Sequence, residues 1–446
     1  MWFLCDMDKT FRPWDVDQVW LLPPSVQELV PPGHLAHLVR DTVRETLDLS
    51  AIFAAYDEER GYPPYHPAMM TALLLYGYCQ GIYSSRRIAC ACRERVDFMA
   101  VTALQKPDFR TVSDFRKRHL KALGDLFIQV LTLCKQAGLV RLGHVALDGT
   151  KIRANASKHK AMSYGRMKTE EARLAAEIER WFQEAGRTDE REDREHGRDQ
   201  SGEELPEWVA NKQQRLQRIR EAKAALEAEA RAAAQSETAS ADTKSGKRGS
   251  GKPQPGVPPD KAQRNFTDPD SGIMKNKDGF IQAYNAQAAV DASSQVIVAR
   301  EVTQAATDAR ELAPMVAQIK ANIGRQAEEL SADAGYCSEE NLKELKRRHI
   351  EGYVATGRQK HGQASATGSR KSPSGQRVAA MRAKLRRAGY RSRYRLRKQT
   401  VEPVFGQIKQ ARGFRQFLLR GVEKVRGEWD LICTAHNLLK WAKAVG

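Results

Sequence analysis

The segment 144–157, HVALDGTKIRANAS, places one carboxylate in an otherwise apolar stretch that alternates like a buried strand. Alternation puts Val145 and Leu147 on one face of the extended chain and Asp148 on the other. Burying an acid on such a strand is costly unless a cation or a basic group pairs with it. The sequence therefore predicts that a metal ion or a basic partner from elsewhere in the chain meets Asp148.

Composition limits the class of protein. The chain has 446 residues, enough for two or three domains, and its 41% hydrophobic content can fill ordinary cores. No apolar run reaches the length of a membrane span, and the N-terminus lacks a signal-peptide pattern, so we expect a cytoplasmic protein with no membrane partner. The seven cysteines are scattered without a CxxC pair, which favours reduced thiols, although Cys90 and Cys92 could in principle bind a metal.

The positive charge is confined to one segment. Residues 341–420 contain 22 Lys and Arg against three acids, Glu344, Glu351 and Glu402, so this segment carries the whole excess behind the net charge of +18. A solvated basic surface is the ordinary explanation of a charge run, but such confinement favours a polyanion partner. We expect that partner to be nucleic acid.

The first part of the chain, 24–139, has apolar residues at helical spacing. Segment 69–79 is apolar nearly all round, which predicts a core helix. Ser84 and Ser85 could cap one following helix and Thr111 another. Two short helices with arginines near their starts suit a DNA-binding helix-turn-helix, and a plain helical bundle explains them equally well.

An insertion is expected from 165 to 263. Segments 167–182 and 208–233 carry apolar stripes and should pair as an antiparallel helical hairpin. The segments after each helix, 188–204 and 236–259, are polar and low in hydrophobic residues, and we expect both to be disordered linkers.

Strand patterns resume after the insertion. Segments 283–290 and 295–302 read as two strands joined by a turn, 306–323 as a helix and 328–336 as a further strand that ends with Asp333. This order is typical of a mixed α/β sheet, in which the first and fourth strands can be neighbours. Asp148 and Asp333 would then leave one edge together, with room for two divalent ions roughly 3.5 to 4 Å apart.

A third acid is needed to bind the second ion. Glu402 is the candidate, because it is one of few acids in a segment rich in Lys and Arg. The alternative is a structural salt bridge to Arg395, Arg397 or Lys398. Lys409 follows two helical turns later and so shares the face of Glu402. Pro403 places Glu402 near a helix start or kinks a longer helix.

Other acids and histidines were weighed for the same chemistry. Asp291 is followed by a turn, and Asp308 sits near a helix start, where the helix dipole explains it. Asp268 and Asp270 resemble turn residues. His144 precedes the first strand, and the apolar spacing around His436 favours a core or capping role. Asp333 therefore remains the preferred second acid.

The chain resembles the DDE transposases of bacterial insertion sequences. The resemblance rests on the order of several motifs rather than on one: FRPWDVDQVWLLPPSVQELVPPGHLA, HVALDGTKIRANAS, NFTDPDSGIMK, YNAQAAVD, ADAGY and YRLRKQTVEPVFGQIK. It implies an RNase H-like catalytic core, with Asp148, Asp333 and Glu402 as the metal-binding catalytic acids. The implied cofactor is Mg²⁺ or Mn²⁺, two ions in all.

The related signature Tyr-x2-Arg-x3-Glu-x6-Lys is met only in part. Tyr394, Arg397, Glu402 and Lys409 fit it with one extra residue after Arg397. Either Lys398 takes the place of the arginine or the helix geometry differs. The expected DNA contacts are Lys409, Arg397, Lys398, Tyr394, Arg395, Arg412, Lys151 and Arg116.

The sequence thus leads to an α/β chain of four parts. We expect a helical region at 1–139 that binds DNA ends, a first part of the catalytic core at 140–164, the insertion at 165–263, and the rest of the core with basic C-terminal helices at 264–446. The expected activity is cleavage and strand transfer of the protein's own element, acting on terminal inverted repeats and target DNA as a dimer or larger assembly. The alternatives are an inactive, transposase-derived DNA-binding protein and an RNase H-like nuclease without strand transfer.

Overall fold

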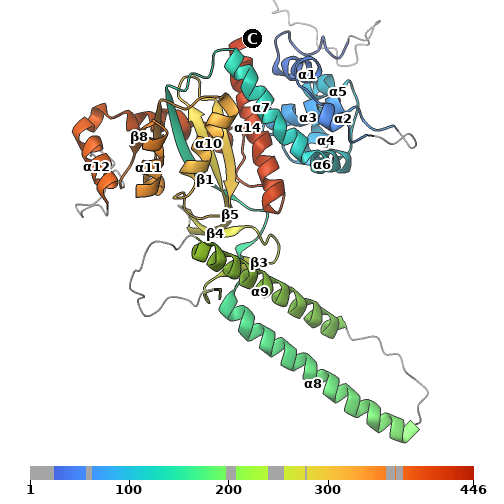
Figure 1. Ribbon diagram of the computed structural model, residues 1–446. Helices are drawn as coiled ribbons and strands as arrows, with labels where there is room; N and C mark the ends of the chain where they lie inside the picture. The colour runs from blue at the N-terminus through green and yellow to red at the C-terminus, as the bar shows by residue number, and fades with distance from the viewer. Residues whose placement is uncertain are drawn as a thin grey trace, which may run out of the picture.

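A computed structural model describes residues 25–56, 63–196, 207–239, 256–276, 279–357, 367 and 375–445. Cys5 and most of the first motif of the resemblance lie outside the described residues, as do large parts of both expected linkers. Figure 1 shows three regions: a group of helices from the N-terminal part, a sheet with flanking helices, and a long helical arm.

The N-terminal region contains helices and connecting turns in its described residues. The helices are α1 (Leu35–Glu45), α2 (Ser50–Phe53), α3 (Pro67–Cys79), α4 (Ser85–Glu94), α5 (Val96–Thr102), α6 (Phe109–Arg118) and α7 (Leu120–Gln136). Helix α3 is buried nearly all round, which confirms the expected core helix. The expected cap at Thr111 is wrong, because α6 begins three residues earlier and the Asp108 carboxylate accepts from the backbone N–H of Arg110 and Thr111.

A six-stranded mixed sheet forms the centre of the second region. Its strands are β1 (His144–Arg153), β4 (Gly272–Asn276), β5 (Gly279–Asp291), β6 (Ile297–Thr303), β7 (Glu329–Ala332) and β8 (Glu351–Val354). The order is β4-β5-β1-β7-β8, and β6 also pairs with β5. Strand β1 is antiparallel to β5 and parallel to β7. The expected RNase H-like mixed sheet is confirmed.

Helices cover the sheet and join it to the N-terminal region. They are α10 (Leu312–Ile323), α11 (Glu339–Arg347), α12 (Gln376–Ala388), α13 (Leu396–Gly406) and α14 (Val422–Val445). Helix α14 packs against β6 and lies beside α7 and α3 (Figure 1), while α13 packs against β1 and β5. The Asn437 side chain bonds both backbone groups of Ile297, so α14 is fixed to the sheet by polar contacts as well as apolar ones.

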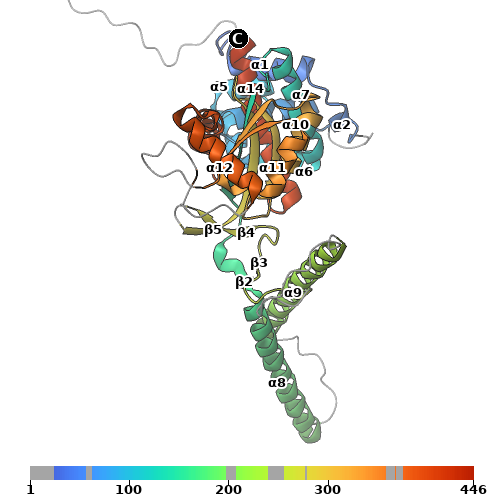
Figure 2. The same cartoon turned by 60° about the vertical axis from the view of Figure 1, so that its left-hand side comes forward.

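The insertion forms an arm that projects away from the sheet (Figures 1 and 2). It leaves through β2 (Ala161–Ser163), continues as α8 (Tyr164–His196) and α9 (Glu207–Ala239), and returns through β3 (Gln263–Asn265), which pairs with β2. Two ion pairs join the helices, Glu171–Lys223 at 2.8 Å and Glu177–Lys212 at 2.9 Å. The later residue of α8 pairs with the earlier residue of α9, so the two helices are antiparallel. The antiparallel hairpin is therefore as expected.

Helix α8 is longer than its apolar stripe indicated. It continues through 188–196, which had been assigned to a linker for want of apolar residues. The segment is rich in Glu and Arg, both of which have high helix propensity, so its sequence can continue the helix without an apolar stripe. Within the described segments, none of the helices combines the length and the apolarity that crossing a bilayer requires.

Candidate functional site

Asp148 and Asp333 occupy equivalent positions on two neighbouring parallel strands. The last residues that pair between β1 and β7 are Leu147 and Ala332, and each acid directly follows one of them. Strand β1 itself continues to Arg153, so Asp148 lies within the strand, opposite Ala288 of β5, and not at a strand end as its sequence predicted. Backbones of adjacent strands lie about 4.8 Å apart, so the two acids lie close together. The expected neighbourhood of the first and fourth strands is confirmed. Strand β7 is shorter than expected, because Asp333 already caps the turn Ala334–Tyr336 and accepts from the N–H of Gly335 at 2.8 Å.

Glu402, on α13, is linked to Asp148 by the side chain of Arg397. Arg397 donates from Nη1 to Asp148 Oδ2 at 2.6 Å and from Nη2 to Glu402 Oε1 at 2.7 Å. The contact of Glu402 in the structure is thus a salt bridge to Arg397, which is the alternative to metal binding. Lys398 is exposed, so Arg397 is the residue that faces the acids despite the extra residue in the spacing.

The guanidinium of Arg397 occupies the space between two of the three acids. Among the described residues, no three His, Cys, Asp or Glu side chains are close enough together to form a ready metal site. The donor chemistry nevertheless suits a hard divalent cation, because carboxylate oxygens are the ligands that Mg²⁺ and Mn²⁺ prefer. A cation here would take over the charge that Arg397 now neutralises.

Two further residues, Tyr394 of the partial signature and Pro403 of α13, support this arrangement. The Tyr394 ring lies beside Arg397, with the guanidinium carbon 5.9 Å from the ring centroid. Pro403 lies inside α13, where it cannot donate to the carbonyl of Gln399. That carbonyl instead accepts from the side chain of Gln295 at 3.0 Å, so the helix continues through the proline without an unpaired group there.

Lys409 anchors the end of α13 to β1. A π-helical turn, Gln407–Ala411, follows α13 and brings Lys409 over the strand. Its ammonium donates to the Thr150 hydroxyl and to the backbone carbonyl of Lys151, the latter at 2.8 Å. Burial, assisted by the charge of Arg415, lowers the pKa of Lys409 to about 8. A lysine so placed can stabilise negative charge near Asp148 and can lose its own charge at mildly alkaline pH.

The acids lie in a poorly solvated, electronegative environment. Burial raises the pKa of Asp148 to about 7; the charges of Asp333 and Asp308 act in the same direction, and Arg397 opposes them. Burial also raises the pKa of Asp333, again with Asp308 contributing. Displaced pKa values with identified charged neighbours are common at catalytic sites.

Asp308 was assigned to a helix start, and that interpretation is wrong. Helix α10 begins at Leu312, and the Asp308 carboxylate instead accepts from the side-chain amides of Asn285 at 2.6 Å and Gln287 at 2.7 Å. Lys151 lies 3.7 Å away. The signal that could have revealed it was the pair Asn285 and Gln287, two amides on one face of an otherwise apolar central strand.

The other competing residues have structural partners. Asp291 accepts from the backbone of Arg141 and Leu142 at the far end of β5. His436 is buried against the carbonyl of Gln295, as its apolar surroundings predicted, and His144 contacts Glu329 and Ser331. In the register of β1, Asp291 lies opposite Val145 and His144 begins the strand, so both lie toward the start of β1.

Two of the expected DNA contacts face into the protein. Arg116 is only 3% exposed and donates to Tyr83 O and Tyr78 Oη, with the buried Glu428 as its countercharge. Arg412 donates to His436 at 3.1 Å and its pKa is lowered by burial. Neither guanidinium is presented to solvent, so both predictions are corrected to structural roles. The burial of these two arginines could not be predicted from the sequence, because a buried arginine has no characteristic local sequence pattern.

Basic side chains remain exposed around the acids. Arg391, Arg393 and Arg395 lie in the chain that leads into α13, Lys398 lies in the first turn of α13, and all four are exposed. Arg393 also pairs with Glu329. Lys151 is largely buried beside Asp308. The exposed group therefore borders the site and can meet a phosphate backbone.

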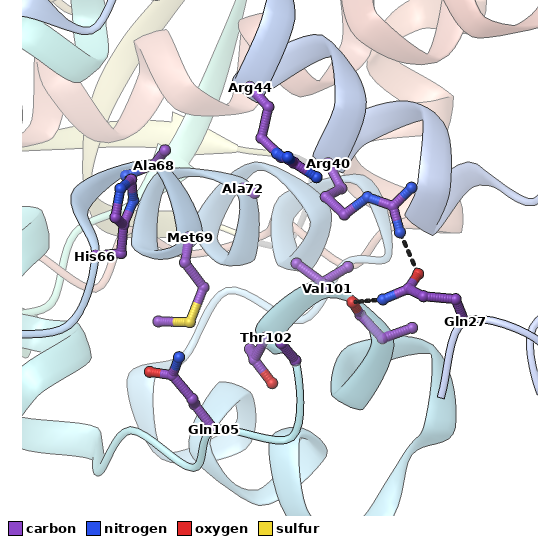
Figure 3. Close-up of a pocket in the computed structure, with 12 residues that line it drawn as sticks. Gln27, Arg40, Arg44, His66, Ala68, Met69, Ala72, Val101, Thr102 and Gln105 are labelled. Carbon is purple, nitrogen blue, oxygen red and sulfur yellow. Dashed lines mark hydrogen bonds between the residues drawn. The ribbon is translucent and has the colours of Figure 1, made fainter. Parts of the chain in front are cut away.

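A pocket of about 500 Å³ lies elsewhere, among α1, α3 and α5 of the N-terminal region (Figure 3). Arg44, His66 and Met69 are among its lining residues. Arg40 and Gln27 also line it, and the Arg40 guanidinium donates a hydrogen bond to the Gln27 side chain. The described residues that line it include no acid, so it cannot supply carboxylates for a cation. It is separate from the acidic site.

The fold and the acidic edge together define an RNase H-like domain joined to a helical N-terminal region. Residues 24–118 match the family described as "Transposase domain (DUF772)", and residues 252–438 match the family described as "Transposase DDE domain". The chain is a DDE-type transposase by these two matches. Comparison with curated proteins and with solved structures finds no match.

The two matches contain Asp333 and Glu402 but not Asp148. Strand β1 and the arm lie between the matched segments, apart from the final residues of the insertion. The assignment of Asp148 to the site therefore depends on the pairing of β1 with β7 and on its contact with Arg397.

Proposed function

We propose that this transposase cleaves DNA at the ends of its own element and joins the freed ends to target DNA, with Asp148, Asp333 and Glu402 as the catalytic acids. The observation that carries the proposal is the position of Asp148 and Asp333 directly after the last residues that pair β1 with β7, with Glu402 linked to Asp148 by Arg397. In the cleavage reaction water attacks phosphorus and the 3′ oxygen leaves as a hydroxyl. That hydroxyl then attacks a target phosphodiester and displaces its 3′ oxygen.

The three carboxylates would bind Mg²⁺ or Mn²⁺, by our expectation two ions. Bound ions of this kind stabilise the attacking and leaving oxygens of an in-line phosphoryl transfer. Asp148 and Asp333 are suited to this because they are partly desolvated and fixed by the sheet. Glu402, with a side chain 44% exposed, is the acid with most freedom to move.

Arg397 and Lys409 have roles that depend on their geometry. Arginine presents a planar fork that matches phosphate oxygens as well as carboxylates. When cations neutralise the acids, Arg397 is free to bind the phosphate that flanks the scissile bond. Lys409, fixed to the end of β1, keeps a positive charge beside Asp148.

DNA reaches the site along the basic chain before α13 and along the N-terminal helices. Arg391, Arg395 and Lys398 are exposed in the same segment as Arg397 and would position the phosphate backbone. Arg86 and Arg110 are exposed on the contacting helices α4 and α6, which suits the proposed role of this region in end binding. Pairing of two ends implies at least a dimer on DNA.

The test uses the full-length protein and a supercoiled plasmid that carries the gene with its natural flanks. We expect Mg²⁺-dependent breaks at the element ends and joined products, and we expect Asp148→Asn, Asp333→Asn and Glu402→Gln to reduce both to background while end binding persists. Glu423→Gln, at an exposed acid of α14, is the matched control and should behave as wild type.

The products distinguish the alternatives. Breaks without joined products would favour a nuclease that lacks strand transfer. End binding without breaks in the wild type would favour an inactive DNA-binding protein. Full cleavage by Asp148→Asn would refute the assignment of the acids.

A further inference from the structure

Asp308 lies in the connection between β6 and α10, with its carboxylate held in a fixed orientation. Oδ1 accepts from the amides of Asn285 and Gln287, at 2.6 and 2.7 Å. In the part of the chain that the structure describes, no hydrogen bond reaches Oδ2. Gln287 is itself fixed, since its Oε1 accepts from the buried Tyr336 hydroxyl. One oxygen of Asp308 therefore orients the group, and the other is left available.

The available oxygen is turned toward Asp333. A Cβ built on Gly335 would lie 3.0 Å from Asp333 Oδ1 and 3.1 Å from Asp308 Oδ2, so both oxygens border the same small space beside Gly335. Two carboxylate oxygens that face one space repel each other unless a cation lies between them or nearby. The absence of a side chain at Gly335 leaves that space open.

A second glycine lets Asp308 approach β1. A Cβ on Gly149 would lie 2.7 Å from Asp308 Oδ1 and 2.3 Å from Gln287 Nε2, distances that no ordinary side chain tolerates. Asp308 thus lies directly against the backbone next to Asp148. Any larger residue at 149 would push it away from the site.

Asn285 supplies an independent sign of a missing partner. Its side chain is fully buried, and its Oδ1 has no hydrogen-bond partner among the described residues. That oxygen lies 2.9 Å from the Cβ position of Gly149, beside Asp308 Oδ1. A buried carbonyl oxygen without a donor costs free energy, and a cation or a water bound to one would satisfy it.

We propose that Asp308 is a fourth cation-binding carboxylate of this site, oriented by Asn285 and Gln287, and that it shares a divalent cation with Asp333. This inference rests on the proposed function, because it concerns the same acids. Ligating carboxylates are commonly oriented by hydrogen bonds from neighbouring amides, which is the arrangement seen here. Lys151, 3.7 Å from Asp308, provides positive charge to the carboxylate and would move away as the cation binds.

The experiment measures Mn²⁺ binding to the full-length protein without DNA, by the loss of the free Mn²⁺ electron paramagnetic resonance signal. We expect Asp308→Asn to weaken the binding of Mn²⁺ by roughly tenfold or more, the scale on which metal sites respond to such losses. Asp308→Glu, which retains the carboxylate, should recover part of that affinity. Glu311→Gln, in the same connection, is the matched control and should bind Mn²⁺ as wild type.

The outcomes separate this inference from the proposed function. If Asp148→Asn and Asp333→Asn lose Mn²⁺ while Asp308→Asn binds it normally, the role of Asp308 is refuted and the proposed function stands. If the wild type binds no Mn²⁺ and still cleaves DNA, both are refuted. Melting temperatures without metal check folding; should Asp308→Asn unfold, weakened binding by a folded Asp308→Glu supports the inference and unchanged binding by it refutes the inference.

Discussion

The Arg397 guanidinium lies 2.6 Å from the carboxylate of Asp148, a residue 249 positions earlier in the chain. The same guanidinium contacts Glu402, so one positive charge is shared between two of the proposed catalytic acids. Arg397 thus acts in the metal-free protein as the charge partner that the isolated acid of β1 requires. This relationship makes the stability of the site depend on which cation, guanidinium or metal, is present.

Arg397→Ala should destabilise the metal-free protein. Removing one partner of a largely buried ion pair leaves an uncompensated charge, at a cost on the order of 3 kcal/mol in the free energy of unfolding. Millimolar Mg²⁺ should restore part of that loss, because a bound cation replaces the missing charge. Urea unfolding with and without Mg²⁺ measures both effects.

Lys398→Ala is the control for that experiment, since it removes a neighbouring exposed cation. It should change the free energy of unfolding by no more than about 0.5 kcal/mol, as surface substitutions generally do. A similar loss in both variants, or a loss in Arg397→Ala that Mg²⁺ leaves unchanged, would contradict the proposed exchange of charges.

The stability of the protein should depend on pH through Asp148. Its folded pKa of about 7 exceeds the ordinary value of 3.8, so the folded protein keeps a proton that the unfolded chain releases. The contribution of Asp148 to stability therefore falls as pH rises from about 4 to about 7 in the absence of metal. Divalent cations bind the ionised carboxylate, so Mg²⁺ should raise the melting temperature more at about pH 8 than at about pH 5.

Asp148→Asn provides the comparison for this pH dependence. It should remove most of the difference between the two Mg²⁺ shifts. Asp430, whose pKa burial raises to about 6, remains in the variant and leaves a residual dependence on pH. Equal Mg²⁺ shifts at both pH values in the wild type would show that Asp148 does not bind the cation.

Lys409 should set the alkaline limit of activity. Because burial lowers the pKa of its ammonium to about 8, the wild type should lose DNA cleavage as pH rises past that value. Lys409→Arg keeps its charge and should move the limit to higher pH, even if its maximal rate is lower. A pH profile of the cleavage rate tests this, and identical profiles for the two proteins would exclude Lys409 as the titrating group.

Gly149→Ala should damage both the fold and the site. The added Cβ would meet Gln287 and Asp308 at 2.3 and 2.7 Å, so these side chains must move. Overpacking of this kind costs about 1–3 kcal/mol. Gly143→Ala, where the nearest atom is 3.9 Å away, is the control and should unfold like the wild type in urea.

Local patterns in the sequence were enough to predict four strands of the sheet and two acids on them, but not the strands β4 and β8. Alternation in 144–157 and the strand ending at Asp333 carry their own periodicity, and the rule that first and fourth strands can be neighbours placed them together. The hairpin arm followed from two apolar stripes. These features depend on residues close in sequence, which is why they could be inferred.

The parts that were missed depend on contacts between distant segments. Arg116 and Arg412 have the sequence context of surface cations, and only the packing of α3, α6 and α14 shows that both are enclosed. Asp308 precedes a helix and so resembled a residue explained by the dipole. Its true partners, Asn285 and Gln287, lie more than twenty residues earlier on β5.

The arm between β1 and the rest of the sheet also has a consequence for synthesis of the protein. Asp148 is made 185 residues before Asp333 and 254 residues before Glu402. At about 5–20 residues per second, roughly 10–50 s pass before a ribosome that has made Asp148 adds Glu402. A chain released early would carry the helical N-terminal region, for which we propose DNA end binding, without the complete set of proposed catalytic acids. Truncated products of the gene are thus candidates to occupy element ends and compete with the intact enzyme.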